Sequence, residues 1–127
     1  MPLTNAGRDY LAQVIFSNVT KFDNANAYIG VGDGTTAFAK TQTDLTGTNK
    51  FRKGMVSGFP NQTGVDPNQV VFKSSFSTSD ANFTWQEYGI FNASTGGTML
   101  CRKQENIGSK TSQQVWDFTV TLTFNNP

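Results

Sequence analysis

The segment 27–36, AYIGVGDGTT, contains residue types that bind phosphate or metal ions in many proteins. A dinucleotide-binding loop needs the spacing G-x-G-x-x-G before a helix, and a Walker-type loop ends in Gly-Lys-Ser/Thr. A calcium-binding EF-hand needs several acidic ligands, whereas only Asp33 is present here. These mismatches favour a strand that ends in a tight turn. In this interpretation Gly30 and Gly32 let a neighbouring ring or backbone approach closely, and Asp33-Gly34 makes the turn.

Glu87 is the acidic residue with the most apolar surroundings, because it lies in the segment 83–91, FTWQEYGIF. A carboxylate buried there without a partner is strongly unfavourable, so Glu87 needs a cation nearby. Arg52 and Arg102, each in a strand-like segment, are the candidates for a structural ion pair. The alternative is the general acid of a glycosidase, which requires a second carboxylate a few ångströms away. No motif pairs Glu87 with the other acids, which are Asp9, Asp23, Asp33, Asp44, Asp66, Asp80, Glu105 and Asp117.

The sequence contains no histidine and a single cysteine, Cys101. The commonest general base and transition-metal ligand is therefore missing, and Ser-His and Cys-His catalytic arrangements are impossible. One thiol and scattered carboxylates do not make a zinc site, and one cysteine forms no internal disulfide. We predict no catalytic residue, no metal and no cofactor, and we expect Cys101 to be a buried, inert thiol.

The chain of 127 residues has the length of one domain, residues 1–127. Its charged residues make up 15% of the total, below the usual quarter, and its net charge is +1. A nucleic-acid-binding protein normally shows a basic face or run, which is not visible here. The N-terminus lacks the pattern of a secretory signal, and no segment approaches the roughly 18 apolar residues of a membrane span. We therefore expect a soluble protein without a nucleic-acid or membrane partner.

The hydrophobic pattern predicts one helix followed by about six or seven strands. Residues 4–16 should form the helix, capped by Thr4 or Asn5, with an apolar face that runs to Ile15. We expect strands near 28–32, 51–58, 70–77, 83–91, 98–103 and 116–124, a turn at 58–67, and an irregular connection at 33–49. Gly96 and Gly97 permit the positive φ of a hairpin turn. The last strand alternates most cleanly and should be central or line a subunit contact.

These elements predict a mainly β fold, namely a small antiparallel β-sandwich or barrel with one N-terminal α-helix and a β-rich body at about 27–125. Five motifs stand in a recognisable order: 3–12 (LTNAGRDYLA), 27–36, Thr43-Asp44-Leu45 with Arg52, 85–92 (WQEYGIFN) and 96–103 (GGTMLCRK). This order is similar to that of small virion proteins of tailed bacteriophages. More distantly, it resembles the N-terminal module of phage tail-collar and tail-fibre proteins. There a T-x-x-G helix, an I-x-x-G-D-G strand-turn and an E-x-G-[IL]-F strand follow one another in the same order.

The resemblance covers nearly the whole chain and implies an architectural role without a reaction or a cofactor. Tail-fibre proteins continue into a receptor-binding region, whereas this chain ends at Pro127. A free-standing module of this size implies a capsid decoration (cement) protein, with a tail, baseplate or tail-fibre adaptor as the alternative. The expected partners are further copies of the chain, in a homotrimer, and the major capsid protein or other virion proteins. The expected location is the virion, after synthesis in the bacterial cytoplasm.

A carbohydrate-binding module is the competing interpretation from another functional class. Phe59 or Trp85 would then be a stacking platform for a host-surface glycan, since exposed aromatic rings are what sugar binding uses. The chain has 11 phenylalanines, so packing in a core is the more economical explanation of these rings. A small hydrolase that uses Glu87 is the last of the alternatives.

Overall fold

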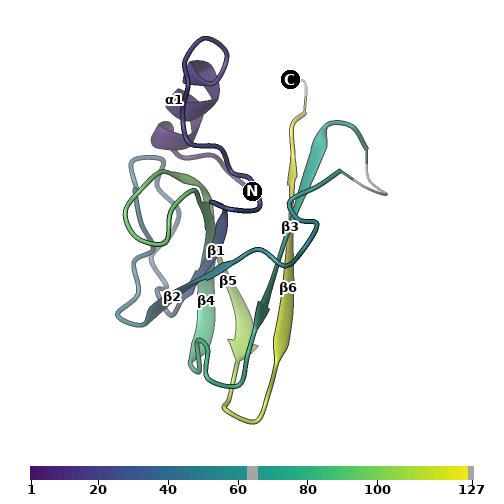
Figure 1. Cartoon of the computed structure of the whole chain (residues 1–127). Coiled ribbons are helices and arrows are strands. Elements are labelled where there is room, and N and C mark those ends of the chain that lie inside the picture. Colours follow the sequence, from purple (N-terminus) through teal and green to yellow (C-terminus); the bar gives the residue numbers. More distant parts are fainter. Residues whose placement is uncertain (63–65, 126–127) are drawn as a thin grey trace.

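The computed structural model describes residues 1–62 and 66–125, and its architecture is mainly β with one short helix and antiparallel sheets. The elements are α1 (Asn5–Gln13), β1 (Tyr28–Gly32), β2 (Lys50–Gly54), β3 (Gln69–Phe76), β4 (Thr84–Phe91), β5 (Met99–Ser109) and β6 (Trp116–Thr123). One sheet has the strand order β2-β1-β4-β5, and the other pairs β3 with β6 (Figure 1). The predicted fold class, a small antiparallel β-sandwich with an N-terminal helix, is confirmed.

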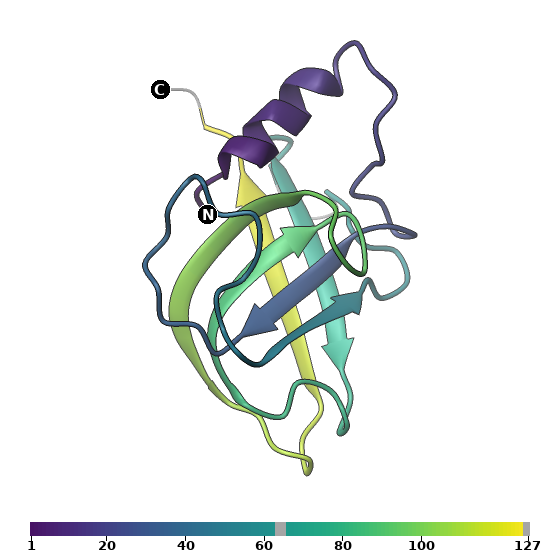
Figure 2. The same ribbon diagram turned by 90° about the vertical axis from the view of Figure 1, so that its left-hand side faces the viewer.

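The two sheets form the two layers of the sandwich, and their strands cross at an angle (Figure 2). Trp85 on β4 is completely buried and joins the layers. Its ring meets that of Phe76 on β3 at a centroid distance of 4.8 Å and that of Trp116 on β6 at 4.9 Å, both edge to face. Such aromatic pairs contribute about 0.5–1.5 kcal/mol each beyond the burial of their area. The core therefore contains an aromatic cluster that holds the two-stranded layer on the four-stranded one.

The helix α1 is attached to the start of β5 by its first turn. The Thr4 hydroxyl accepts a hydrogen bond from the Gly7 N–H at 2.9 Å, the predicted N-cap, and donates one to the Met99 carbonyl at 2.5 Å. A Cβ at Gly7 would collide with the carbonyl of Leu100, so the helix backbone lies directly on the strand. The N-cap and Gly7 together fix where the helix begins and which strand it covers.

The helix ends at Gln13 and not at residue 16, and this part of the prediction was wrong. Ile15, which we placed on the buried face, is 85% exposed, and Phe16 is 81% exposed. A nine-residue helix is stabilised mainly by its packing, so it ends where its contact with β5 ends. Periodicity extended the predicted helix into a turn whose last two apolar residues, Ile15 and Phe16, are exposed.

The strands follow the predicted order, with differences at their ends. β1 coincides with its prediction, β2 ends four residues early at Gly54, and β5 continues to Ser109. Gly96 and Gly97 have φ of +61° and +67° in the hairpin between β4 and β5, as expected. In the predicted turn at 58–67, residues 63–65 lie outside the described part of the chain. No helix in the described residues is long and apolar enough to cross a membrane.

Of the two positions predicted for the last strand, the central one was wrong, and the position at a subunit contact stays a prediction. Its alternation is correct, because Val120 and Leu122 are buried while Thr119 and Thr121 are exposed. Within the described residues, however, β6 pairs with β3 in a two-stranded sheet. Alternation shows that one face of a strand is buried, and it carries no information on how many strands lie beside it.

Candidate functional site

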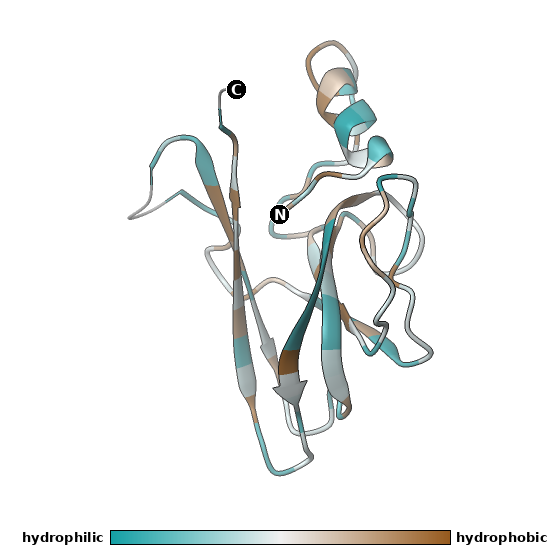
Figure 3. Cartoon of the chain, turned by 180° about the vertical axis from the view of Figure 1, so that it is seen from behind, coloured by the Kyte–Doolittle hydropathy of each residue, from teal (hydrophilic) through white to brown (hydrophobic). Residues whose placement is uncertain are grey.

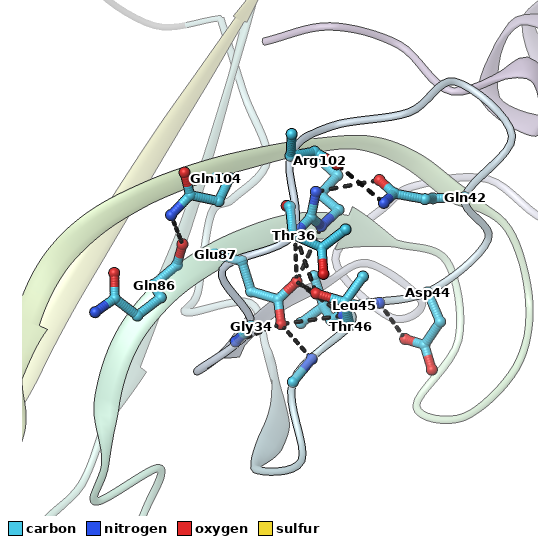
Figure 4. Close-up of polar contacts among 12 residues, drawn as sticks. Gly34, Thr36, Gln42, Asp44, Leu45, Thr46, Gln86, Glu87, Arg102 and Gln104 are labelled. Carbon is cyan, nitrogen blue, oxygen red and sulfur yellow. Dashed lines mark hydrogen bonds and ion pairs between the residues drawn. The ribbon is translucent and has the colours of Figure 1, made fainter.

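The polar centre of the molecule is an ion pair between Glu87 on β4 and Arg102 on β5, and both side chains are fully buried. The register places Glu87 opposite Gln104, so Arg102 is its diagonal neighbour on the same face of the sheet. Glu87 Oε1 lies 2.9 Å from both Nε and Nη2 of Arg102 (Figure 4). Of the two arginines proposed as partners of Glu87, the structure places Arg102 beside it.

Three backbone N–H groups bind the Glu87 carboxylate, one from the segment 27–36 and two from residues that follow it. Glu87 Oε2 accepts hydrogen bonds from the backbone N–H groups of Gly34 at 3.0 Å and Gly47 at 2.7 Å. Its Oε1 accepts one from the N–H of Thr46 at 2.9 Å. Backbone N–H groups that converge in this way form an anion-binding concavity. Gly34 of the segment 27–36 therefore does contact an anion, which is a side chain of the same chain.

Two glycines of β1 leave the space that this arrangement needs. A Cβ at Gly32 would lie 2.5 Å from Glu87 Oε2, and one at Gly30 would lie 2.5 Å from the Phe91 ring. Gly30 thus shows the close approach of an aromatic ring that we expected, and Gly32 shows the approach of a carboxylate. Asp33, the expected turn residue, accepts hydrogen bonds from the backbone and side-chain nitrogens of Asn49 at 3.1 and 2.8 Å. It therefore joins the two ends of the connection 33–49. The predicted tight turn at Asp33-Gly34 was wrong, because residues 33–39 run on without a turn.

Arg102 holds the same connection in place with its two Nη nitrogens. Nη1 donates to the Gln42 side chain at 3.1 Å, and Nη2 donates to the Thr36 carbonyl at 2.8 Å. The negative Glu87 and the positive Arg102 therefore both hold the connection 33–49 on the sheet. Neither Glu87 oxygen is exposed, so the geometry offers no place for a substrate at this carboxylate. Among the described residues, no buried side-chain nitrogen or oxygen lacks a hydrogen-bond partner.

Arg52 on β2 lies at a separate position, where it supports the hairpin between β4 and β5. Its Nη1 donates to the carbonyls of Ala93 and Gly96, both at 2.9 Å, and its Nη2 lies 3.3 Å from Asp44 Oδ1. The guanidinium also lies 3.5 Å above the centroid of the Phe91 ring, a cation–π contact. Arg52 is therefore a structural cation, but its partner is Asp44 and not Glu87.

The residues considered for other chemistry are buried or half-buried. Trp85 is completely buried, so its proposed use as a glycan platform was wrong. Phe59 is half-buried, with the ammonium of Lys73 5.8 Å from its ring centroid. Cys101 is completely buried, and burial raises the pKa of its thiol to about 12. The thiolate, which is the reactive form, is therefore scarce at neutral pH.

Sequence reasoning missed the residues of the connection 33–49 that complete the Glu87 site, above all Gln42, Thr46 and Gly47. They act largely through backbone N–H groups, which leave no pattern of residue types. The motif Thr43-Asp44-Leu45 beside them was the one available signal. Lys110 was also missed: it is buried, and its Nζ donates to the Ser77 carbonyl at 2.6 Å and the Asn82 side chain at 2.8 Å.

A polar groove of about 500 Å³ lies between α1 and the hairpin loop 92–98. Its polar side chains are largely bonded to each other and to nearby backbone. Gln13 donates to Asp9 at 2.6 Å, and Asn92 bonds the Thr20 carbonyl and the Thr98 N–H. Within residues 1–62 and 66–125, no group of three or more acidic or cysteine side chains could hold a metal ion.

No family model, curated protein or solved structure matches the chain. The geometry around Glu87 and Arg102 therefore carries the functional interpretation. These buried polar residues hold loops of their own chain.

Proposed function

We propose that the chain is a bacteriophage virion structural protein, and specifically a capsid decoration (cement) protein that binds the capsid shell and stabilises it. The observation that supports this proposal is how the structure uses the three motifs that resemble those of phage tail-collar and tail-fibre modules. In each of three motifs, the named residues hold one part of the chain on another. They form a scaffold that presents an outer surface, and the Glu87 carboxylate at its centre is fully buried.

The first motif attaches the helix. Thr4 and Gly7 supply the spacing T-x-x-G, in which Thr4 caps α1 and Gly7 lies on the Leu100 carbonyl. In the second motif, Gly32 and Gly34 make room for the Glu87 carboxylate. The first motif thus holds the helix on β5, and the second accommodates the carboxylate that holds the connection 33–49. Both roles fit a stable structural module.

The third motif, E-x-G-[IL]-F, supplies Glu87, and also Gly89 and Phe91. A Cβ at Gly89 would lie 2.8 Å from the Cys101 carbonyl, so Gly89 permits the close approach of β4 and β5. Phe91 lies beneath the Arg52 guanidinium. The motif therefore joins the middle of the sheet to both the connection 33–49 and the hairpin 92–98.

Cementing would work by mass action. A protein that binds the expanded shell and not the opened one stabilises the closed state by RT ln(1 + [L]/Kd), which grows with the logarithm of its concentration relative to its Kd. The partners in this proposal are the major capsid protein and further copies of the chain, most simply in a homotrimer at a threefold position. A tail, baseplate or tail-fibre adaptor would use the same scaffold at a position of lower copy number.

The copy number of the chain in virions tests the proposal. Purified virions of the phage that encodes the chain are separated on a gel, and its band is quantified against that of the major capsid protein. Hundreds of copies per virion are expected for decoration, whereas about a dozen would identify the adaptor. Absence of the chain from virions would overturn the structural role altogether.

A second experiment tests stabilisation directly. Virions stripped of the protein are mixed with the purified chain, and release of DNA on heating is followed with a dye. The release temperature should rise with the concentration of the chain and reach a plateau. An unrelated soluble protein at equal concentration is the control, and equal shifts with both would contradict specific cementing.

A further inference from the structure

Two large apolar side chains project from the end of α1. Ile15 is 85% exposed and Phe16 is 81% exposed, and we call these two residues the α1 tip. The turn that carries them is ordered by hydrogen bonds from the N–H groups of Phe16 and Ser17 to the Gln13 carbonyl, at 3.2 and 2.8 Å. Figure 3 colours the end of α1 and the turn that follows it tan to brown. Single exposed apolar residues are ordinary, but two adjacent large ones on an ordered turn form a patch that water solvates poorly.

An apolar groove of about 230 Å³ lies beside the α1 tip, between α1 and the end of the β3–β6 sheet. Leu11 and Val14 form the wall of the groove on the helix side. Val70, Leu122 and Phe124 form its wall on the side of the β3–β6 sheet. The side chains that line the groove are aliphatic or aromatic, and none is charged. A charged or strongly polar occupant would lose its hydration there without gaining a partner, so the groove selects an apolar occupant.

The chain does not fill this groove with its own α1 tip. Val14 already belongs to the wall of the groove, and the next two residues turn outward and remain exposed. Phe22 then brings the chain back, with its ring 4.8 Å from that of Tyr10. One molecule therefore carries both an apolar projection and an apolar groove, and it cannot join them within itself.

We propose that Ile15 and Phe16 of one copy enter the apolar groove of a neighbouring copy. The volume is appropriate: an apolar cavity of about 150 Å³ accepts a benzene ring, so about 230 Å³ accepts a phenylalanine ring with part of an isoleucine. A projection and a groove at different places on one molecule make a head-to-tail contact, which closes into a ring when the rotation allows it. This contact is a specific basis for the self-association in the proposed function.

The buried area is sufficient for a stable contact. A phenylalanine buries about 150–250 Å² at an interface, an isoleucine somewhat less, and the groove loses a similar area. One contact therefore removes roughly 600 Å² from water. In a reciprocal dimer two contacts lie in the same interface, which then approaches the roughly 1,200 Å² of the smallest stable interfaces. A closed trimer also gives each copy two contacts, but they join it to two different partners, so each interface of a trimer buries only roughly 600 Å².

The mass of the free chain in solution tests the inference. Light scattering after size-exclusion chromatography should show a dimer or trimer that dissociates on dilution. The double variant Ile15→Ser/Phe16→Ser should weaken association at least about a hundredfold, since two large apolar side chains stay in water. Its urea midpoint as a monomer should not fall, because both side chains are exposed in the single chain.

Two further variants distinguish specific binding in the groove from nonspecific hydrophobic association. Phe124→Ser, on the rim of the groove, should also weaken association, by roughly tenfold. Val115→Ser is the matched control, because Val115 is 60% exposed and lies outside the groove. It should change association less than twofold.

A cross-link locates the contact. Cys101 is buried, so an introduced cysteine is the reactive thiol of each variant. When chains with Phe16→Cys are mixed with chains with Phe124→Cys, mild oxidation should form a disulfide-linked pair. A mixture of Phe16→Cys chains with Val115→Cys chains is the control and should not form such a pair. A monomer at all concentrations, or an oligomer that the α1-tip variant leaves unchanged, would overturn the contact. Neither result would contradict the proposed binding to the capsid, because the copy number in virions tests that proposal separately.

Discussion

Glu87 Oε1 lies 2.9 Å from both Nε and Nη2 of Arg102, and the two side chains are completely buried at the centre of the sheet. A buried ion pair adds little net stability, because the desolvation of both charges offsets their attraction. Its effect here is positional: the three N–H groups of Gly34, Thr46 and Gly47 converge on the carboxylate. The pair therefore determines where the connection 33–49 lies on the sheet.

Glu87→Gln should destabilise the protein by about 3–5 kcal/mol, the usual consequence of leaving a buried charge without its partner. The new amide would also direct N–H groups at the N–H groups that now donate to the carboxylate. Unfolding in urea, followed by tryptophan fluorescence, measures the change in the free energy of unfolding.

Glu105→Gln is the matched control for this loss. Glu105 pairs with Lys103 on the same strand at 3.0 Å, but both side chains are about half exposed. Exposed pairs contribute about 1 kcal/mol or less, so the urea midpoint should move little. Similar losses in the two variants would mean that Glu87 has no special structural role.

Gly32→Ala and Gly54→Ala should change stability in opposite directions, although both glycines lie in strands. A methyl group at Gly32 would press against the Glu87 carboxylate and cost about 1–3 kcal/mol. At Gly54 the nearest atom is in the Tyr28 ring, 3.7 Å away, an ordinary contact. The reduced freedom of the unfolded chain should then stabilise by about 0.5 kcal/mol. Thermal unfolding of both variants gives the comparison, and equal losses would contradict it.

Local signals predicted some features of this fold because local interactions determine them. The apolar run of β1 ends at glycines, and the Thr4 cap bonds a residue three positions away. The end of α1 and the edge position of β6 depend on what packs beside them, which the pattern of one element does not contain. The anion-binding role of Gly34 could not be predicted either, because its partner is 53 residues away.

Asp80 should stabilise the protein at neutral pH and lose this effect in acid. Hydrogen bonds from Lys53 and from Ser77 lower the pKa of its carboxyl below the usual value of 3.8. A depressed carboxyl pKa adds stability above the pKa of the unfolded chain, and this contribution disappears as the pH falls toward the folded value. The difference in urea midpoint between the protein and Asp80→Asn should therefore be largest near pH 7 and shrink below about pH 4. A difference that stays constant with pH would exclude the charge as the cause.

Cys101 should be unreactive in the folded protein and reactive when the protein unfolds. Burial raises the pKa of its thiol from 9.0 to about 12, so almost none of it is thiolate at pH 8. A colorimetric thiol reagent should detect no reactive thiol per native chain, and one per chain in guanidinium. The raised pKa also has a consequence in alkali: its contribution to stability is complete below the thiol pKa of the unfolded chain and declines as the pH rises toward the folded value. Cys101→Ala removes this dependence, so the stability of the unmodified protein should fall more steeply above about pH 9 than that of the variant. Parallel decline of the two, or rapid labelling of the native chain, would show that the thiol is open to solvent.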